Sequence, residues 1–133
     1  MRKITLIIIH CSATRADHSY TFEDCRNDHI RHRHFKDIGY HYYITRDGSI
    51  HKGRPEEQVG AHCRHHNRYS IGICYEGGLD TKGKAADTRT PAQRAALHAL
   101  VHSLRRDYPQ AIVVGHHTLD PHKDCPCFDV KDL

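Results

Sequence analysis

Two uninterrupted apolar runs near the ends of the chain constrain its fold most strongly. The run "ITLIII" covers residues 4–9 and is followed by His10, and "AIVVG" covers residues 111–115 and is followed by His116 and His117. Short continuous apolar runs of this kind are typical of buried strands. Because side chains at strand ends project into a cleft at the edge of a sheet, we expect both strands to deliver histidines to such a place.

Two helices are predicted between these strands. The first, within residues 21–33, begins at Thr21 with Asp24 three positions on, which is a capping pattern. The second, within residues 90–109, has an N-cap, a proline at the first helical position and a capping-box partner: Thr90, Pro91 and Gln93. Its predicted apolar face consists of Ala95, Leu97, Leu100, Val101 and Leu104.

A hairpin and a further strand complete the predicted elements. Residues 38–53 alternate aromatic and polar side chains around a bend at Asp47 and Gly48, and residues 69–78 form an apolar run closed by two glycines. The order strand, helix, hairpin, strand, helix, strand predicts an α/β fold with a central mixed sheet flanked by helices. A chain of 133 residues has the size of one domain, so residues 1–133 are expected to form a single unit.

The six cysteines could form disulfide bonds or bind a metal, and the expected location of the protein helps to decide between these uses. The N-terminal "MRKITLIIIH" lacks the small-residue cleavage site of a secretory signal, and no apolar stretch is long enough to cross a membrane. The protein is therefore expected to be cytoplasmic as synthesised, where thiols stay reduced. Metal ligation is favoured over disulfide formation.

The segment "GHHTLDPHKDCPCFD", residues 115–129, gathers three histidines, two cysteines and a lysine. If the two apolar strands are neighbours, His10, His116 and a cysteine of this segment could meet around one ion. Three nitrogen or sulfur ligands leave the fourth position of a zinc ion open to water, which is typical of a catalytic site. Zinc lowers the pKa of bound water from ~15.7 to about 7 and so permits amide hydrolysis, helped by a donor such as Lys123 or Tyr40. Among 15 histidines, spacing alone does not distinguish ligands from surface or core residues.

Six segments, in order, give the chain a resemblance to a known family. They are "IIIHCSAT" (7–14), "DIGYHYYITRDG" (37–48), "GRPEEQVGAH" (53–62), "NRYSIGICYEGG" (67–78), "TPAQ" (90–93) and "GHHTLDPHKDCPCFD" (115–129). The chain resembles the zinc-dependent N-acetylmuramoyl-L-alanine amidases, which include phage lysozymes with amidase activity and peptidoglycan-recognition proteins. The resemblance implies one Zn²⁺ per chain and cleavage of the amide bond between N-acetylmuramic acid and L-alanine of peptidoglycan.

The resemblance also implies the roles of six residues. By position in the matching motifs, the zinc ligands are His10, His116 and Cys125. Tyr40 and Lys123 take the catalytic assisting roles, and His62 lines the substrate groove. The chain departs from the family in having Cys74 where some members carry a glutamate, an extra His122 before Lys123, and no tryptophan.

Several other residues have structural interpretations. Cys25 and His29 lie four positions apart on one helical face, yet with no third ligand near in sequence we expect Cys25 to pack and His29 to face solvent. We expect Cys11 to pack in the core, because it follows a ligand on a strand and points away from it. Cys127 is expected to be a buried or spare thiol. Solvent exposure is expected for His65, His66, Glu56 and Glu57.

Two other functions stay open at this point: a peptidoglycan-binding module that does not cut, and an intracellular regulator of an RNA polymerase, as the resembling phage lysozymes also are. Direct nucleic-acid binding is not favoured, because the basic residues form no stripe with interleaved aromatic side chains. As an amidase the protein is expected to be a monomer. It would reach the wall through a lesion made by a partner such as a phage holin, or act on imported wall fragments.

Overall fold

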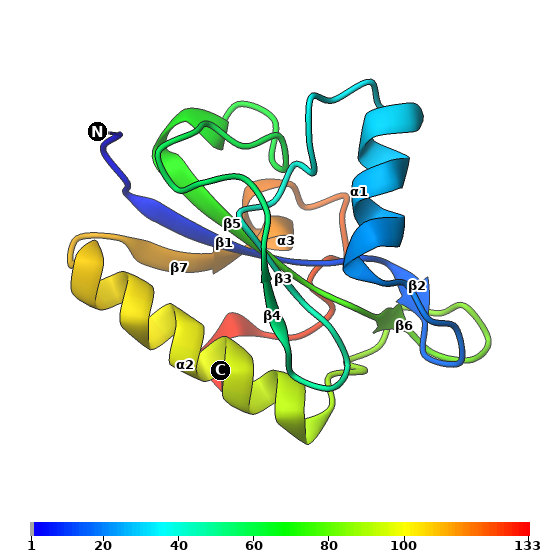
Figure 1. Ribbon diagram of the computed structural model, residues 1–133. Helices are drawn as coiled ribbons and strands as arrows, with labels where there is room; N and C mark the ends of the chain where they lie inside the picture. The colour runs from blue at the N-terminus through cyan, green and yellow to red at the C-terminus, as the bar shows by residue number, and fades with distance from the viewer. Residues whose placement is uncertain (1) are drawn as a thin grey trace.

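The central sheet contains five strands in the order β4-β3-β5-β1-β7 (Figure 1). The computed structural model describes residues 2–133. The strands are β1 (Leu6–Cys11), β3 (Tyr42–Ile44), β4 (Ile50–Lys52), β5 (Ser70–Tyr75) and β7 (Ile112–Gly115). All neighbours are parallel except β3 and β4, which form the antiparallel hairpin predicted around Asp47 and Gly48. The predicted mixed sheet is confirmed.

The first apolar run lies inside the sheet, paired on both sides. In β1, Ile9 is opposite Ile73 of β5 and Gly115 of β7. Strands covered on both faces carry apolar side chains at every position, which explains the uninterrupted run. Since β1 and β7 are parallel neighbours, their carboxyl ends lie side by side at one end of the sheet.

Both predicted helices are present with their predicted caps. Thr21 and Asp24 form a capping box at the start of α1 (Phe22–Arg31), and Thr90 and Gln93 form one at the start of α2 (Pro91–Asp107). The predicted apolar face of α2 needs one correction. Ala95 is exposed, whereas Gln93 is buried and donates from its side-chain amide to the carbonyl groups of Ile44 and Glu76.

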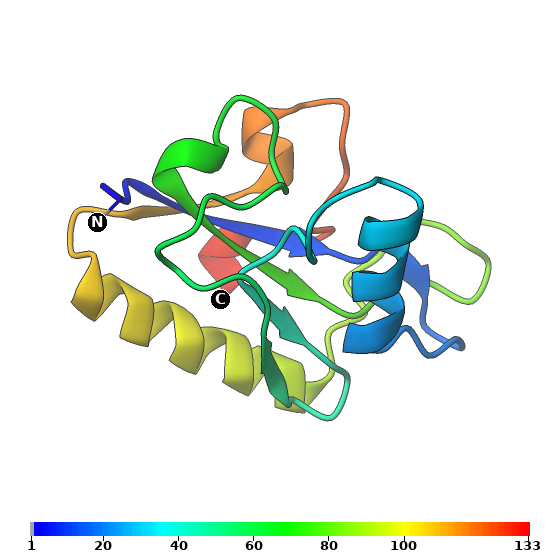
Figure 2. The same ribbon diagram turned by 45° about the horizontal axis from the view of Figure 1, so that its top comes forward.

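The two helices cover opposite faces of the sheet (Figure 2). One core cluster joins Leu97, Val101 and Leu104 of α2 to strand residues that include Ile7, Ile9, Ile71 and Ile73. The other joins Cys25 of α1 to Ile38, Tyr43 and Cys74. Because alternate strand residues point to opposite faces, His10, which is paired with Cys74, lies on the face that α1 covers.

The shortest elements were not predicted. A two-stranded parallel sheet joins β2 (Thr14–Arg15) to β6 (Gly78–Leu79). The helical turns η1 (Asn67–Tyr69), α3 (His116–Leu119) and η2 (Val130–Asp132) contain three or four residues each. Such elements are too short for a hydrophobic period to develop. Within residues 2–133, no helix is both long and apolar enough to cross a membrane.

Three predictions of solvent exposure are wrong, and one of them concerns His66, which is half-buried with its Nδ1 2.7 Å from the hydroxyl oxygen of Tyr69. His29 is buried, 7% exposed, and its Nδ1 accepts a hydrogen bond of 2.8 Å from the amide of Gly39. Glu56 is half-buried and accepts hydrogen bonds from the hydroxyls of Tyr42 and Tyr108. Cys25 and Cys11 are buried as predicted, and Asp47 accepts from the amide of Ser49 within the hairpin turn.

Glu76 connects three separate segments, and its removal is expected to destabilise the fold. Only 4% exposed, its carboxylate accepts from the amides of Tyr20 (2.7 Å) and Arg46 (3.0 Å). Glu76→Ala leaves two amide donors without their acceptor, so we expect the free energy of unfolding to fall by about 3 kcal/mol. Urea denaturation measures this. The exposed Glu57, changed to alanine, should shift stability by no more than about 0.5 kcal/mol. Equal losses of unfolding free energy in Glu76→Ala and Glu57→Ala would contradict this role of Glu76.

Candidate metal centre

His10 is the fifth residue of β1 and lies where this strand approaches its carboxyl end. Its side chain is 2% exposed. The two ring nitrogens face different partners: Nε2 lies 2.9 Å from Nδ1 of His62, and Nδ1 lies 3.8 Å from Sγ of Cys125. Pairing with Cys74 of β5 therefore fixes the backbone of His10, and two neighbours fix its ring.

His116 directly follows β7 and begins α3. The strand ends at Gly115, and His116 and His117 both lie in the helical turn that follows. The imidazole of His116 lies beside that of His10, with ring centroids 4.7 Å apart. His117 turns to the following loop, where its Nδ1 donates to the carbonyl of Lys123 (2.5 Å) and its amide donates to the carbonyl of Cys125 (2.7 Å).

Cys125 lies in the loop between α3 and η2, and side chains from distant segments fix that loop. The hydroxyl of Tyr75 donates to the carbonyl of Pro126 (2.6 Å), and the guanidinium of Arg89 lies 3.4 Å from the ring centroid of Phe128. The amide of Cys11 donates to Sγ of Cys125 (3.1 Å). This hydrogen bond holds the sulfur of Cys125 beside the last residue of β1.

These three side chains form one group that could hold a metal ion. One ligand atom each from His10, His116 and Cys125 lies within 4.8 Å of the other two. Among residues 2–133 this is the one such group of three histidine, cysteine or acidic side chains. Burial, with the nearby His62 and His116, holds the pKa of His10 well below its usual value, and burial next to Lys123 lowers that of His116. Both imidazoles are therefore neutral at pH 7, as metal ligation requires.

The group lies in a cleft of about 880 Å³. Tyr40 and His62 line the cleft, together with Lys123. The ring centroid of Tyr40 lies 5.2 Å from that of His10. Burial raises the pKa of Tyr40 well above its usual value, so its hydroxyl stays protonated at neutral pH. The cleft thus combines a ligand group with a hydroxyl donor and a cation.

Two buried histidines shape this cleft in ways that the sequence did not indicate. Besides accepting from Gly39, His29 places its ring centroid 5.4 Å from that of Tyr40. His41 is 1% exposed and its Nδ1 accepts from the amide of Gly72. The sequence gives no local signal for either hydrogen bond, because both depend on contacts across the fold.

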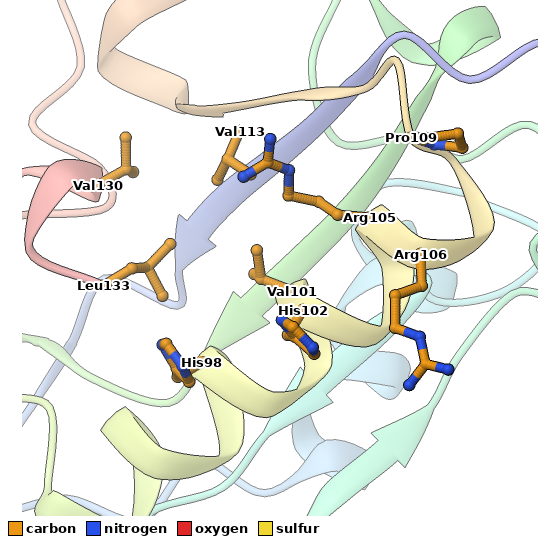
Figure 3. Close-up of a pocket in the computed structure, with 9 residues that line it drawn as sticks. All are labelled: His98, Val101, His102, Arg105, Arg106, Pro109, Val113, Val130 and Leu133. Carbon is orange, nitrogen blue, oxygen red and sulfur yellow. The ribbon is translucent and has the colours of Figure 1, made fainter.

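A second pocket, of about 500 Å³, lies between α2, β7 and the C-terminal turn (Figure 3). His98 and His102 project from successive turns of α2 toward Val113 and Leu133. None of its lining residues belongs to the cleft. The pocket has two histidines but no thiol or carboxylate side chain among its lining residues, so it offers no set of three ligands.

The model of the N-acetylmuramoyl-L-alanine amidase family matches residues 1–128. The chain belongs to this family. Among curated relatives, the endolysin of Escherichia phage T7 is 41% identical over 125 residues, which are 94% of this chain and 82% of the relative. The endolysin of Enterobacteria phage K11 is 40% identical over 123 residues, which are 92% of this chain and 80% of the relative.

Solved structures agree with this membership. The endolysin N-acetylmuramoyl-L-alanine amidase LysCS from Clostridium intestinale has a TM-score of 0.81 at 30% identity, over 96% of this chain and 78% of the other. Drosophila PGRP-LB has a TM-score of 0.78 at 25% identity, and the match covers 95% of this chain and 76% of the PGRP-LB chain. Family and fold together identify the protein as an amidase that cleaves peptidoglycan.

Proposed function

We propose that this amidase is zinc-dependent and hydrolyses the amide bond between N-acetylmuramic acid and the L-alanine of the stem peptide. The observation that carries the proposal is the approach of His10, His116 and Cys125 to within 4.8 Å of one another in the cleft. These three residues come from one chain, so the proposed site needs no second copy of the protein, and we propose a monomer.

The donor set fits zinc. Two imidazoles and a thiolate match the three-ligand sets of catalytic zinc sites, and thiolate ligands favour zinc over magnesium or calcium. The amide of Cys11, which donates to Sγ of Cys125, holds this sulfur in place. When bound, zinc supplies a Lewis acid that polarises a carbonyl and acidifies a water molecule.

The remaining roles belong to side chains of the cleft. We assign Tyr40 as the hydroxyl donor to the oxyanion that forms when the scissile carbonyl becomes tetrahedral, because its ring lies beside His10 and its hydroxyl stays protonated. Lys123 adds positive charge near the same carbonyl or transfers a proton to the leaving amine. His62 forms part of the wall along which the substrate lies.

The products of peptidoglycan digestion test this proposal. Purified peptidoglycan is incubated with zinc-loaded protein, with chelated protein and with chelated protein to which zinc is restored, and the soluble products are identified by mass spectrometry. We expect stem peptides with a free N-terminal L-alanine in the first and third samples only. Peptides released equally by chelated protein would overturn the zinc dependence, and products cut at another bond would overturn the assigned reaction.

A further inference from the structure

We propose that His62 is a positioning residue that holds His10 in the orientation needed for metal binding. This inference rests on the proposed zinc site and assigns His62 a role toward the metal ligand in addition to its place on the cleft wall. The starting observation is the contact of 2.9 Å between Nε2 of His10 and Nδ1 of His62.

The contact is compatible with two tautomers of His10, and metal binding requires one of them. A neutral imidazole carries one N–H, so a hydrogen bond between the two rings requires one nitrogen to donate and the other to accept. If Nε2 of His10 donates, its Nδ1 keeps a free lone pair, and Nδ1 is the nitrogen that faces Sγ of Cys125 at 3.8 Å. The opposite tautomer would direct a proton toward the thiol. We propose that Nε2 of His10 donates to His62, which presents the correct nitrogen to a metal ion.

A second hydrogen bond of His62 is compatible with the same arrangement. Its Nε2 lies 3.2 Å from Oγ of Ser70, a completely buried residue of β5. With Nδ1 accepting from His10, Nε2 carries the proton and donates to Ser70. In the proposed arrangement, a chain of donors runs from His10 through His62 to Ser70.

The backbone at two glycines packs closely against the ring of His62. A Cβ atom placed on Gly72 would lie 2.6 Å from Cδ2 of His62, and one placed on Gly60 would lie 2.8 Å from the same atom. Any side chain at either position would displace the imidazole. Oδ1 of Asn67 accepts from the amides of His62 and Cys63, which fixes the loop that carries the ring. A residue held in this way can orient its neighbour.

Metal affinity is the measurement that distinguishes a positioning role of His62 from a role in the cleft wall alone. Loss of a hydrogen-bond partner to a metal-binding histidine typically weakens metal binding by about 10- to 100-fold, and we expect this of His62→Ala in a chelator competition assay. In His62→Asn, Oδ1 takes the place of Nδ1 and still accepts, so its affinity should stay within about threefold of the parent protein. The d–d absorption of the cobalt-substituted protein should change in His62→Ala and persist in His62→Asn. The matched control is His65→Ala, a cleft-lining and exposed histidine.

Tautomers of the unmodified protein provide a test that needs no variant. Nitrogen-15 NMR should show the proton on Nε2 in both His10 and His62. A proton on Nδ1 of His10, or parental zinc affinity and cobalt spectrum in a folded His62→Ala protein, would overturn the proposal while leaving the zinc site intact. Failure of the parent protein to bind zinc would instead overturn the proposed function on which this role rests.

Discussion

Replacing Cys125 by alanine is expected to abolish stoichiometric zinc binding and to lower the amidase rate about 10³-fold. Cys125 supplies the only sulfur of the ligand group, and two histidines alone bind zinc far more weakly than a three-ligand site. Loss of the metal removes several kcal/mol of transition-state stabilisation, and each ~1.4 kcal/mol corresponds to a tenfold change in rate. Metal analysis after dialysis and initial rates on purified muropeptides measure the two effects.

A neighbouring cysteine provides the control for this substitution. Cys127 lies two residues further on, and its Sγ is 3.8 Å from that of Cys11 and outside the ligand group. Cys127→Ser should retain one zinc per chain and parental activity. Because exposed histidines bind zinc loosely, a His98→Ala, His102→Ala double variant of the second pocket controls for adventitious metal and should also keep one zinc. Full zinc-dependent activity of Cys125→Ala would exclude Cys125 as a ligand.

Replacing Tyr40 by phenylalanine is expected to lower kcat by about 10²- to 10³-fold without loss of zinc. The substitution removes one hydroxyl, and loss of one donor to a developing oxyanion typically has an effect of this size. Since the donor acts on charge that forms in the transition state, kcat should fall more than KM rises. Steady-state kinetics on a defined muropeptide separate the two constants.

Tyr69→Phe is the matched control. The hydroxyl of Tyr69 bonds to Nδ1 of His66 (2.7 Å), away from His10, so kcat should stay within about twofold of the parent value. Parental kcat in Tyr40→Phe would remove Tyr40 from the reaction. A fall in kcat accompanied by loss of zinc would show that Tyr40 supports the ligands and is not a donor to the oxyanion.

Local sequence signals predicted most elements of the fold. The capping pairs at Thr21 and Thr90 need only residues three positions away, and the apolar run before His10 reflects burial of β1 on both faces. Both kinds of signal are contained in a few consecutive residues. In contrast, the chain turns into α3 directly after Gly115, and no local pattern marks this turn.

The environment of the candidate site was less accessible to sequence reasoning. The resemblance supplied the identity of the ligand group, which the structure brings together, but not the residues that hold it in place. The contact of His62 with His10 spans 52 positions and depends on a glycine at 72 in a neighbouring strand. His29 shows the same limit, since an isolated histidine on a polar helix gives no sign that a distant amide will donate to it. Long-range packing decides these roles.

X-ray absorption at the zinc edge of protein loaded with one equivalent of zinc tests the central claim most directly. With His10, His116 and Cys125 as ligands, the spectrum should contain one sulfur at about 2.3 Å together with nitrogen or oxygen atoms at about 2.0–2.1 Å, two of which show the outer-shell scattering of imidazole. The sulfur contribution should disappear in Cys125→Ala. A spectrum without sulfur in the parent protein, or one with two or more sulfur ligands, would contradict the assigned metal centre.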